Sequence, residues 1–405
     1  MIYKCLILLL PFVLTCIPGY QLSETTTIQS FDIYFAVILP LSFIGSSHNK
    51  TYSKINKLMK LWLLFFFVAI VSTIINSLSI EFKSNSAYLK TYRLLYPIIL
   101  IAFLTKHSKY LRLKSFEKAF LLSMMISPII GIIGYIQQIP GFIAIQTAQY
   151  DGSDVVFSRA SSYWQEAGIF GVISSFFILL SIIGTMKGGK LRILYIAALF
   201  LNVVALFFSG TRSGAIIIVV ALAYLSFSFG KKYFFRFASA LAVLLVLIVF
   251  LSKNDETGVF NYYLQRMLDV ATITSNNAGD VSSTRTVQWV NTFNSFLNSN
   301  PFNLLLGYGY KTEIFRQLTD NGYLYILISL GAVGLVIFTY FLYQFYKLDF
   351  HDKEGNFINN ANKFAFLTWI VSMLFADTLT YIPVLLFPFL FCFLKIHSES
   401  YENSI

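Results

Sequence analysis

Charged residues, cysteines and nucleotide-binding motifs are scarce or missing in this sequence. Asp, Glu, Lys and Arg make up only 12% of its 405 residues, whereas soluble proteins carry about 25%. The three cysteines, Cys5, Cys16 and Cys392, lie in apolar runs and lack the spacing of a disulfide framework or a metal site. The sequence contains no Walker loop, no GxGxxG fingerprint and no DxD metal motif. The shortage of charge argues against a soluble protein.

Long apolar runs take the place of the missing charge. Hydrophobic residues make up 57% of the chain, and many runs are about 20 residues long, the length of a helix that crosses a bilayer. The sequence therefore predicts an all-α, polytopic integral membrane protein with about 12 transmembrane helices. We expect them at residues 2–19, 31–47, 61–80, 88–105, 119–138, 167–186, 191–208, 213–230, 233–252, 321–346, 364–378 and 383–396.

One long polar stretch, residues 253–320, interrupts the apolar pattern. Helical periodicity at 259–271 and 284–297, followed by a turn-rich segment from Asn300 to Tyr310, predicts a folded cap. The predicted organisation has three parts: helices one to nine in 1–252, the large loop in 253–320, and helices ten to twelve with a tail in 321–405.

The basic residues predict the orientation of the chain. Most of the 30 Lys and Arg residues fall at the termini and in one alternate set of loops, and such loops are normally cytoplasmic. These clusters explain the formal net charge of +11, and no basic run indicates nucleic acid as a partner. The 253–320 loop should then be exterior or periplasmic. The first segment resembles a signal peptide, but Thr15 is a poor residue before Cys16, so we expect a retained helix.

All four histidines, His48, His107, His351 and His397, fall on the predicted cytoplasmic face or tail. A general base at the exterior face must therefore be a carboxylate or an unusual group. Two carboxylates are candidates. Glu166 stands at the entry to the helix predicted at 167–186, and Asp320 precedes Asn321 at the start of the helix predicted at 321–346. The alternative to a catalytic role is that Asp320 or Asn321 is simply a helix N-cap, which these residue types form well.

Arginines at the exterior edge are disfavoured by orientation, and each one needs a partner. Arg212 lies in the hairpin Ser209-Gly-Thr-Arg-Ser-Gly214, whose small residues permit close packing and whose helix start suits an anion. The alternative is that Arg212 extends to lipid headgroups. Arg159 and Glu166 form either a structural salt bridge, which the sequence alone favours, or a pair in which Arg159 binds phosphate and Glu166 binds substrate hydroxyl groups.

Other exterior residues leave similar alternatives open. Arg285 opens a predicted loop helix and either binds an anion or faces solvent. Lys90 and Arg93 share one face of the fourth predicted helix and either bind lipid headgroups, which we prefer, or line the same site. Aromatic residues surround these positions: Tyr163, Trp164, Trp289, Tyr308, Tyr310 and Tyr323. An interfacial aromatic belt explains most of them, although sugar rings also stack on flat apolar faces.

Three segments between residues 159 and 334 together resemble the O-antigen polymerase and ligase superfamily, integral-membrane enzymes that assemble bacterial surface polysaccharides. Their order and spacing carry the resemblance more than any single motif. The segments are Arg159 to Glu166; the Ser-Gly-x-x-Ser-Gly hairpin at 209–214; and Arg285-x3-Trp289 through Pro301 and Leu306-Gly-Tyr-Gly309 to Asp320-Asn321-x-Tyr-Leu, with Gly331 and Gly334 beyond.

The resemblance implies an inverting glycosyl transfer, without a metal or other cofactor, at the outer face of the bacterial cytoplasmic membrane. The implied donor is a glycan on undecaprenyl diphosphate, and the acceptor is a hydroxyl of a second carrier-linked repeat unit. A chain-length regulator is an implied partner besides the lipid bilayer. The implied roles are diphosphate binding for Arg212, Arg285 and Arg159, and the base for Asp320, with Glu166 as second choice. Position and residue type, rather than the resemblance, add Arg93 to the candidates for the diphosphate and give Trp164, Tyr163, Tyr310 and Asn321 as candidates for sugar binding.

Departures from the family pattern favour its polymerase branch. The ligases that act on lipid A core have His-Asn where this chain has Asp320-Asn321, and Ala167 stands where the family has Pro. Two alternatives remain: a ligase-type transferase to a lipid or protein acceptor, and a transporter of lipid-linked glycans. Transporters usually show related halves and polar residues at mid-membrane, whereas the polar residues here gather at one face.

Overall fold

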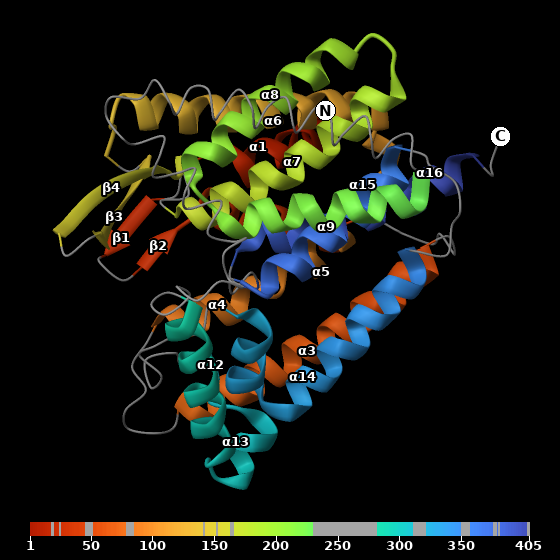
Figure 1. Ribbon diagram of the computed structural model, residues 1–405. Coiled ribbons are helices and arrows are strands. Elements are labelled where there is room, and N and C mark those ends of the chain that lie inside the picture. Colours follow the sequence, from red (N-terminus) through yellow and green to blue (C-terminus); the bar gives the residue numbers. More distant parts are fainter. Residues whose placement is uncertain are drawn as a thin grey trace. The chain divides into compact units, whose positions relative to one another are not determined.

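Helices dominate the computed structural model (Figure 1). The structure describes residues 1–17, 20–23, 26–44, 52–77, 85–140, 142–150, 153–162, 166–229, 282–310, 321–349, 357–375, 379 and 381–402. The chain divides into two compact units, which we describe separately. Unit 1 comprises Met1–Ser123 and Thr284–Ile405, and unit 2 comprises Met124–Ser283.

Seven helices within the described part are long and apolar enough to cross a membrane: Lys54–Ser77, Ala87–Lys106, Leu113–Ile136, Ala167–Lys187, Arg192–Ser209, Gly322–Leu348 and Ile382–Glu399. Shorter apolar helices are Ile2–Thr15, Ser30–Phe43 and Arg212–Tyr224. The prediction of a polytopic helical membrane protein is therefore confirmed. Each predicted crossing overlaps a helix, except 233–252, which lies outside the described residues.

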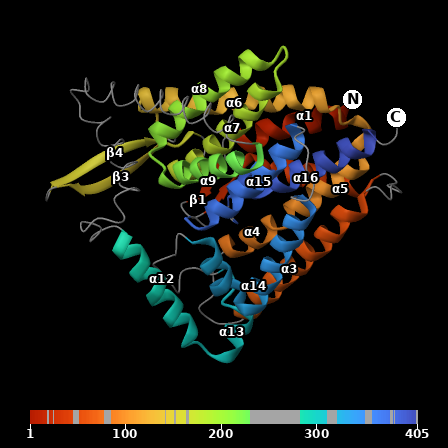
Figure 2. The ribbon, with the colours of Figure 1, turned by 45° about the vertical axis from the view of Figure 1, so that its right-hand side comes forward.

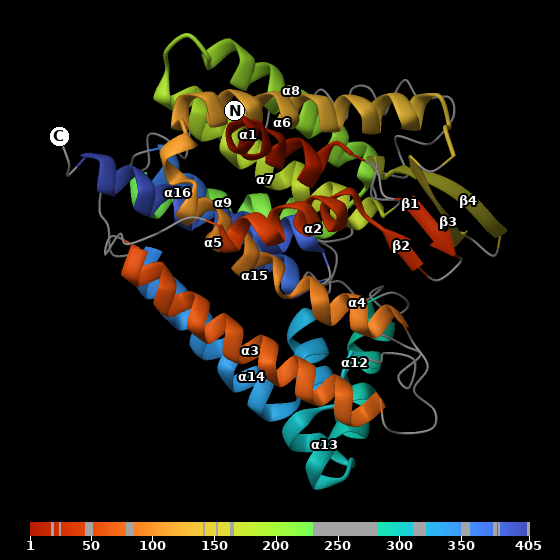
Figure 3. The same ribbon diagram turned by 180° about the vertical axis from the view of Figure 1, so that it is seen from behind.

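Unit 1 contains most of the helices. They are α1 (Ile2–Thr15), α2 (Ser30–Phe43), α3 (Ser53–Ser77), α4 (Asn85–Arg93), α5 (Tyr96–Lys106), the first part of α6 (Leu113–Ile136), α12 (Ser282–Leu297), α13 (Pro301–Leu306), α14 (Gly322–Asp349), α15 (Phe357–Met373) and α16 (Ile382–Glu402). The long helices α3 and α14 lie side by side, as the views from the front and from behind both show (Figures 1 and 3). Strands β1 (Tyr20–Ser23) and β2 (Thr26–Ile28) form a short antiparallel hairpin.

Aromatic rings from four helices fill the core of unit 1. Trp62 of α3 and Trp369 of α15 are fully buried, and their ring centroids lie 6.2 Å apart. Phe389 of α16 lies 5.0 Å from Trp62, and Phe341 of α14 lies 5.1 Å from it. Offset and edge-on ring pairs at such distances are favourable beyond the area that they bury. These contacts hold α3, α14, α15 and α16 together.

Unit 2 is built around α7 (Ala167–Lys187), which packs against α8 (Arg192–Ser209) and α9 (Arg212–Phe229). In the 18-residue apolar window of α7, 94% of the residues are buried, as expected for a helix that is apolar all round. Strands β3 (Ile143–Tyr150) and β4 (Ser153–Ala160) pair antiparallel, from Ile143 opposite Ala160 to Tyr150 opposite Ser153. Their hairpin extends away from the helices of unit 2 (Figure 2).

The loops contain more regular structure than the sequence analysis predicted. Neither β-hairpin was expected, and the segment predicted as turn-rich after Asn300 contains the short helix α13, which Asn300 caps by accepting from the Asn303 backbone N–H. The loop helix predicted at 284–297 is confirmed as α12. The one predicted at 259–271 lies outside the described residues.

Candidate functional site

The hairpin between α8 and α9 is as tight as the sequence predicts. Helix α8 ends at Ser209 and α9 begins at Arg212, so only Gly210 and Thr211 connect them. Gly210 has a φ of 56° and a ψ of 32°, the left-handed conformation that glycine adopts without steric cost. Its N–H donates to the Phe207 carbonyl at 2.9 Å. The first glycine of the motif thus reverses the chain direction.

The second glycine of the motif, Gly214, permits close packing of helices. A Cβ atom added there would lie 2.6 Å from the Leu206 side chain of α8 and 2.6 Å from Ser175 Oγ of α7. Small residues at such crossings let helix backbones approach closely. The start of α9 is therefore held near both neighbouring helices of unit 2, and Arg212 lies at that start.

Arg159, at the end of β4, contacts this hairpin directly. The residue is 7% exposed. Its Nε donates to the Ser209 carbonyl at 2.6 Å, and its Nη2 donates to Thr211 Oγ1 at 3.3 Å. A buried charge requires such partners. Neither of these two acceptors carries a charge, so neither neutralises the guanidinium.

Thr211 joins the hairpin to the first turn of α7. Its Oγ1 donates to the Ala167 carbonyl at 2.8 Å and lies 3.0 Å from Ser209 Oγ, whose proton also faces the Leu206 carbonyl at 2.7 Å. Gly171 makes room for it, because a Cβ atom there would lie 2.4 Å from Thr211 Cβ. The sequence analysis assigned no role to Thr211, and no local pattern indicates that residues 44 positions apart meet in this way.

Glu166 is the N-cap residue of α7, directly before Ala167. Its side chain is exposed and makes no capping hydrogen bond, while its carbonyl accepts from the Phe170 N–H at 3.3 Å. The contacts of Thr211 bring this helix start to the hairpin. The structure thus places Arg159, Glu166 and Arg212, which the sequence separates by up to 53 positions, around one junction in unit 2.

The chemistry of this junction favours a negatively charged group. Helices α7 and α9 have 21 and 18 residues, and both begin there. A helix start carries a partial positive charge and unsatisfied N–H groups that suit phosphate or carboxylate. Arg159 and Arg212 add two positive charges and Glu166 one negative charge, so these three side chains add a net charge of +1. We therefore take the junction as the candidate functional site.

The Leu306-Gly-Tyr-Gly309 motif lies in unit 1, against a break in α14. Gly331 interrupts that helix with a φ of 67° and a ψ of −170°, and a break frees carbonyls of the preceding turn. Tyr308 N–H donates to the Ile328 carbonyl at 2.9 Å, and Gly309 N–H donates to that of Ser329 at 2.8 Å. The motif therefore takes up hydrogen bonds that the broken helix cannot make.

Glycine is required on both sides of this contact. A Cβ atom on Gly307 would lie 2.3 Å from the Ser329 backbone, and one on Gly331 would lie 2.2 Å from the Leu305 carbonyl oxygen. Ser72 of α3 completes the contact, since its Oγ donates to the Ser329 carbonyl at 2.9 Å and accepts from Gly309 N–H at 2.9 Å. The glycines of this family motif thus have a packing role.

Asn321 caps the first half of α14. Its Oδ1 accepts from the N–H groups of Tyr323 and Leu324, both at 3.1 Å. This confirms the helix-cap interpretation for Asn321. Tyr310 is 2% exposed and packs on Tyr325 with ring centroids 5.7 Å apart. For both residues, contact with a sugar stays a prediction.

Several predicted site residues lie outside the description. Asp320, Tyr163 and Trp164 are outside the described residues, and Arg285 lies in α12 without a described side chain. Their implied roles stay predictions.

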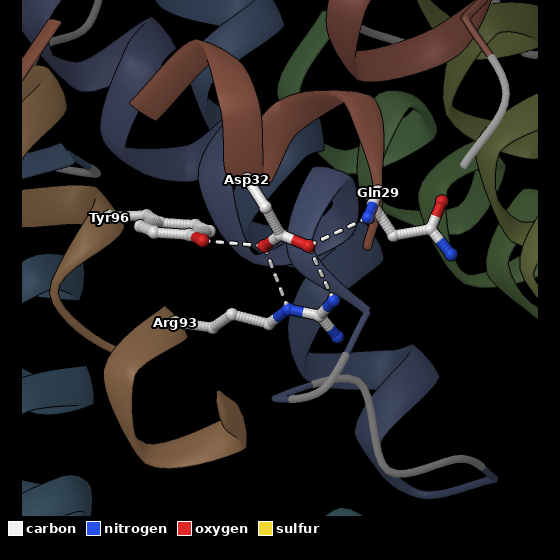
Figure 4. A network of polar contacts seen from close by, with 4 residues as sticks. All are labelled: Gln29, Asp32, Arg93 and Tyr96. Atoms are coloured by element: carbon white, nitrogen blue, oxygen red, sulfur yellow. Dashed lines mark hydrogen bonds and ion pairs between the residues drawn. The ribbon is translucent and has the colours of Figure 1, made fainter. Parts of the chain in front are cut away.

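Arg93, at the end of α4 in unit 1, forms an ion pair that the sequence analysis missed (Figure 4). Its Nε and Nη2 donate to the two carboxylate oxygens of Asp32 at 3.0 and 2.7 Å. Tyr96 OH donates to the same carboxylate at 2.5 Å, and Gln29 N–H donates to it at 2.7 Å. The sequence held one signal for this pair: Asp32 lies in the apolar helix predicted at 31–47, and a carboxylate in such a helix needs a partner.

The fold defines a polytopic helical membrane protein, and a comparison with protein families narrows this class. Residues 197–339 match the family described as O-antigen ligase. The match covers about a third of the chain and includes the α8–α9 hairpin, the Leu306–Tyr310 segment and the break in α14. It confirms the resemblance to the O-antigen ligase and polymerase superfamily, whose members are glycan-processing membrane proteins. No curated protein matches the chain significantly.

Proposed function

We propose that this protein is a bacterial surface-polysaccharide polymerase that transfers a growing glycan from undecaprenyl diphosphate to a carrier-linked repeat unit. The surface glycan is an O-antigen, a capsule or an exopolysaccharide. The site then works at the outer face of the cytoplasmic membrane, as the distribution of basic residues predicts. The family match supports glycan transfer in general, and the polymerase assignment rests on Asp320, which stands where the ligases have His.

The observation that carries the proposal is the junction in unit 2. Arg159 and Arg212 lie beside the starts of α7 and α9, an arrangement suited to a diphosphate. A leaving diphosphate gains negative charge as its bond to the sugar breaks. Fixed positive groups stabilise that charge in the transition state, and they do so without a cation.

The proposed reaction is a single displacement. The acceptor hydroxyl oxygen attacks the anomeric carbon of the donor sugar, and the bond between that carbon and the diphosphate oxygen breaks. The electron pair leaves with undecaprenyl diphosphate, and the anomeric configuration inverts. The hydroxyl proton passes to a carboxylate, for which Asp320 is the first candidate and Glu166 the second. Glu166 stands exposed beside the arginine-bearing junction.

A ligase-type transferase is the second candidate, because the matching family is described as O-antigen ligase. A deletion strain separates the candidates. Loss of a polymerase leaves surface glycan capped with a single repeat unit, whereas loss of a ligase leaves long polymer on the carrier. Loss of a transporter leaves repeat units facing the cytoplasm. We expect the first outcome, and long carrier-linked polymer in the deletion strain would assign the chain to the ligase branch.

A further inference from the structure

We propose that Thr211 is a positioning residue of the junction: its hydroxyl holds the guanidinium of Arg159 at the start of α9, so that Arg159 and Arg212 act on one anion. This inference rests on the proposed diphosphate site and adds a residue to it. Thr211 itself is 4% exposed, so it acts through Arg159 rather than by touching the substrate.

The hydrogen bonds of this hydroxyl have defined directions. A hydroxyl has one donor and two acceptor positions. Thr211 Oγ1 donates to the Ala167 carbonyl and accepts from Arg159 Nη2, while the nearby Ser209 hydroxyl donates to the closer Leu206 carbonyl at 2.7 Å. One oxygen atom thus connects β4, the first turn of α7 and the α8–α9 hairpin. Moving that oxygen moves Arg159 relative to both helix starts.

Two features make the geometry specific. Arg159 reaches the hairpin through two adjacent nitrogen atoms, with Nε on the Ser209 carbonyl and Nη2 on the Thr211 hydroxyl. Two such bonds fix the plane of a guanidinium, where a single bond leaves it free to rotate. In addition, Thr211 packs closely against Gly171, because a Cβ atom added to Gly171 would lie 2.4 Å from Thr211 Cβ. Valine has the same shape as threonine but lacks the hydroxyl, so Thr211→Val separates hydrogen bonding from packing.

The test measures pyrophosphate binding to the full-length protein purified in detergent, from the rise in thermal stability with pyrophosphate concentration. We expect wild type and Thr211→Ser, which keeps the hydroxyl, to bind alike. Thr211→Val should bind about 10-fold to 100-fold more weakly, the range expected for a lost hydrogen bond to a charged group. A purely structural role would lower the melting temperature without ligand but leave the affinity of the folded protein unchanged.

The outcomes separate this inference from the proposed function. Absence of pyrophosphate binding by wild type would overturn the diphosphate site itself. Equal affinities of wild type and Thr211→Val would overturn the role of Thr211 and leave the site standing, and equal weakening in Thr211→Ser and Thr211→Val would do the same. If Thr211→Val does not accumulate, Thr211→Ala decides. It also removes the hydroxyl that binds Arg159 Nη2 but keeps the Ser209 carbonyl that binds Arg159 Nε, so we expect pyrophosphate to bind about 10-fold more weakly, and unchanged affinity overturns the inference.

Discussion

Two arginines with little exposure to solvent, one in each unit, are held in different ways. Arg159 in unit 2 donates to a carbonyl and a hydroxyl, whereas Arg93 in unit 1 donates twice to the carboxylate of Asp32. The first set of partners orients a guanidinium and adds no negative charge. The second set orients it and also balances its charge. The two arginines therefore differ in what they connect: Arg159 joins β4 to the α8–α9 hairpin, and Arg93 joins α4 to α2.

The Asp32 carboxylate is fully engaged. Arg93, Tyr96 and Gln29 together donate four hydrogen bonds to its two oxygens (Figure 4). We therefore interpret the Asp32–Arg93 pair as a connection between α2 and α4.

The largest expected effect tests the unit 2 side of this comparison. Arg212→Ala should abolish chain extension while the protein still inserts and accumulates, because the charge at the start of α9 is lost from the transition state. Glycan length in a complemented deletion strain measures it. Arg192→Ala is the matched control, since Arg192 is exposed and also opens a helix of unit 2, and it should preserve wild-type length.

Arg285→Ala is expected to abolish extension as well. Wild-type-length glycan from Arg212→Ala or Arg285→Ala would remove that residue from the mechanism. Loss of extension in the Arg192→Ala control would show that any lost arginine damages the protein, and the effect of Arg212→Ala would then carry no information about the site.

The second prediction tests the unit 1 side. Asp32→Asn leaves Arg93 largely buried, with side-chain exposures of 14% for Arg93 and 9% for Asp32 in the wild type, and without its charge partner. Breaking such a pair costs about 3–5 kcal/mol, so the purified variant should melt well below wild type. The double variant Asp32→Asn with Arg93→Gln should be more stable than Asp32→Asn alone, because no uncompensated charge remains.

Activity per folded molecule completes this test. If the pair is structural, Asp32→Asn should turn over donor at close to the wild-type rate once corrected for the folded fraction. A loss of pyrophosphate affinity in Asp32→Asn as large as the loss in Arg212→Ala would instead assign Arg93 to the donor site. Arg93 and Arg212 would then be equivalent candidates for the diphosphate.

The third prediction concerns the base. If one carboxylate accepts the acceptor's proton, Glu166→Gln and Asp320→Asn should differ in rate by on the order of 10²-fold. Initial rates of chain extension in membranes, at matched protein levels, provide the measurement. Glu166 stands beside the junction, so a larger loss for Glu166→Gln would assign the role of base to Glu166. Equal and mild losses would mean that neither residue transfers the proton.

Local patterns predicted much of this structure. Apolar runs located the membrane helices, small residues located the α8–α9 hairpin, and the residue type of Asn321 predicted its cap. The sequence contains a local signal for strand β3, because apolar and polar residues partly alternate from Ile143 to Tyr150. The sequence also predicted one site for Arg159, Glu166 and Arg212, but it did so through a family resemblance and not through any predicted contact between them.

Contacts between distant segments were beyond prediction from the residues. The Thr211 hydroxyl bond to Ala167 and the carboxylate bonds of Asp32 depend on how helices pack, which no local period encodes. A glycine inside an apolar run, such as Gly331, fits an unbroken membrane helix as well as a broken one. Only its approach to the Leu305 carbonyl shows why the helix breaks there.

The smallest expected effect sharpens the comparison through a neutral side chain in each unit. Asn321 and Thr211 both bind backbone groups, but Asn321 caps its own helix whereas Thr211 orients an arginine. Asn321→Ala should lower the free energy of unfolding by about 1 kcal/mol, and Asn321→Asp, which keeps an acceptor oxygen, should restore it. Thermal melting in detergent measures both. If Asn321→Asp melts as low as Asn321→Ala, the amide must stabilise the protein by donating a hydrogen bond as well as by accepting one.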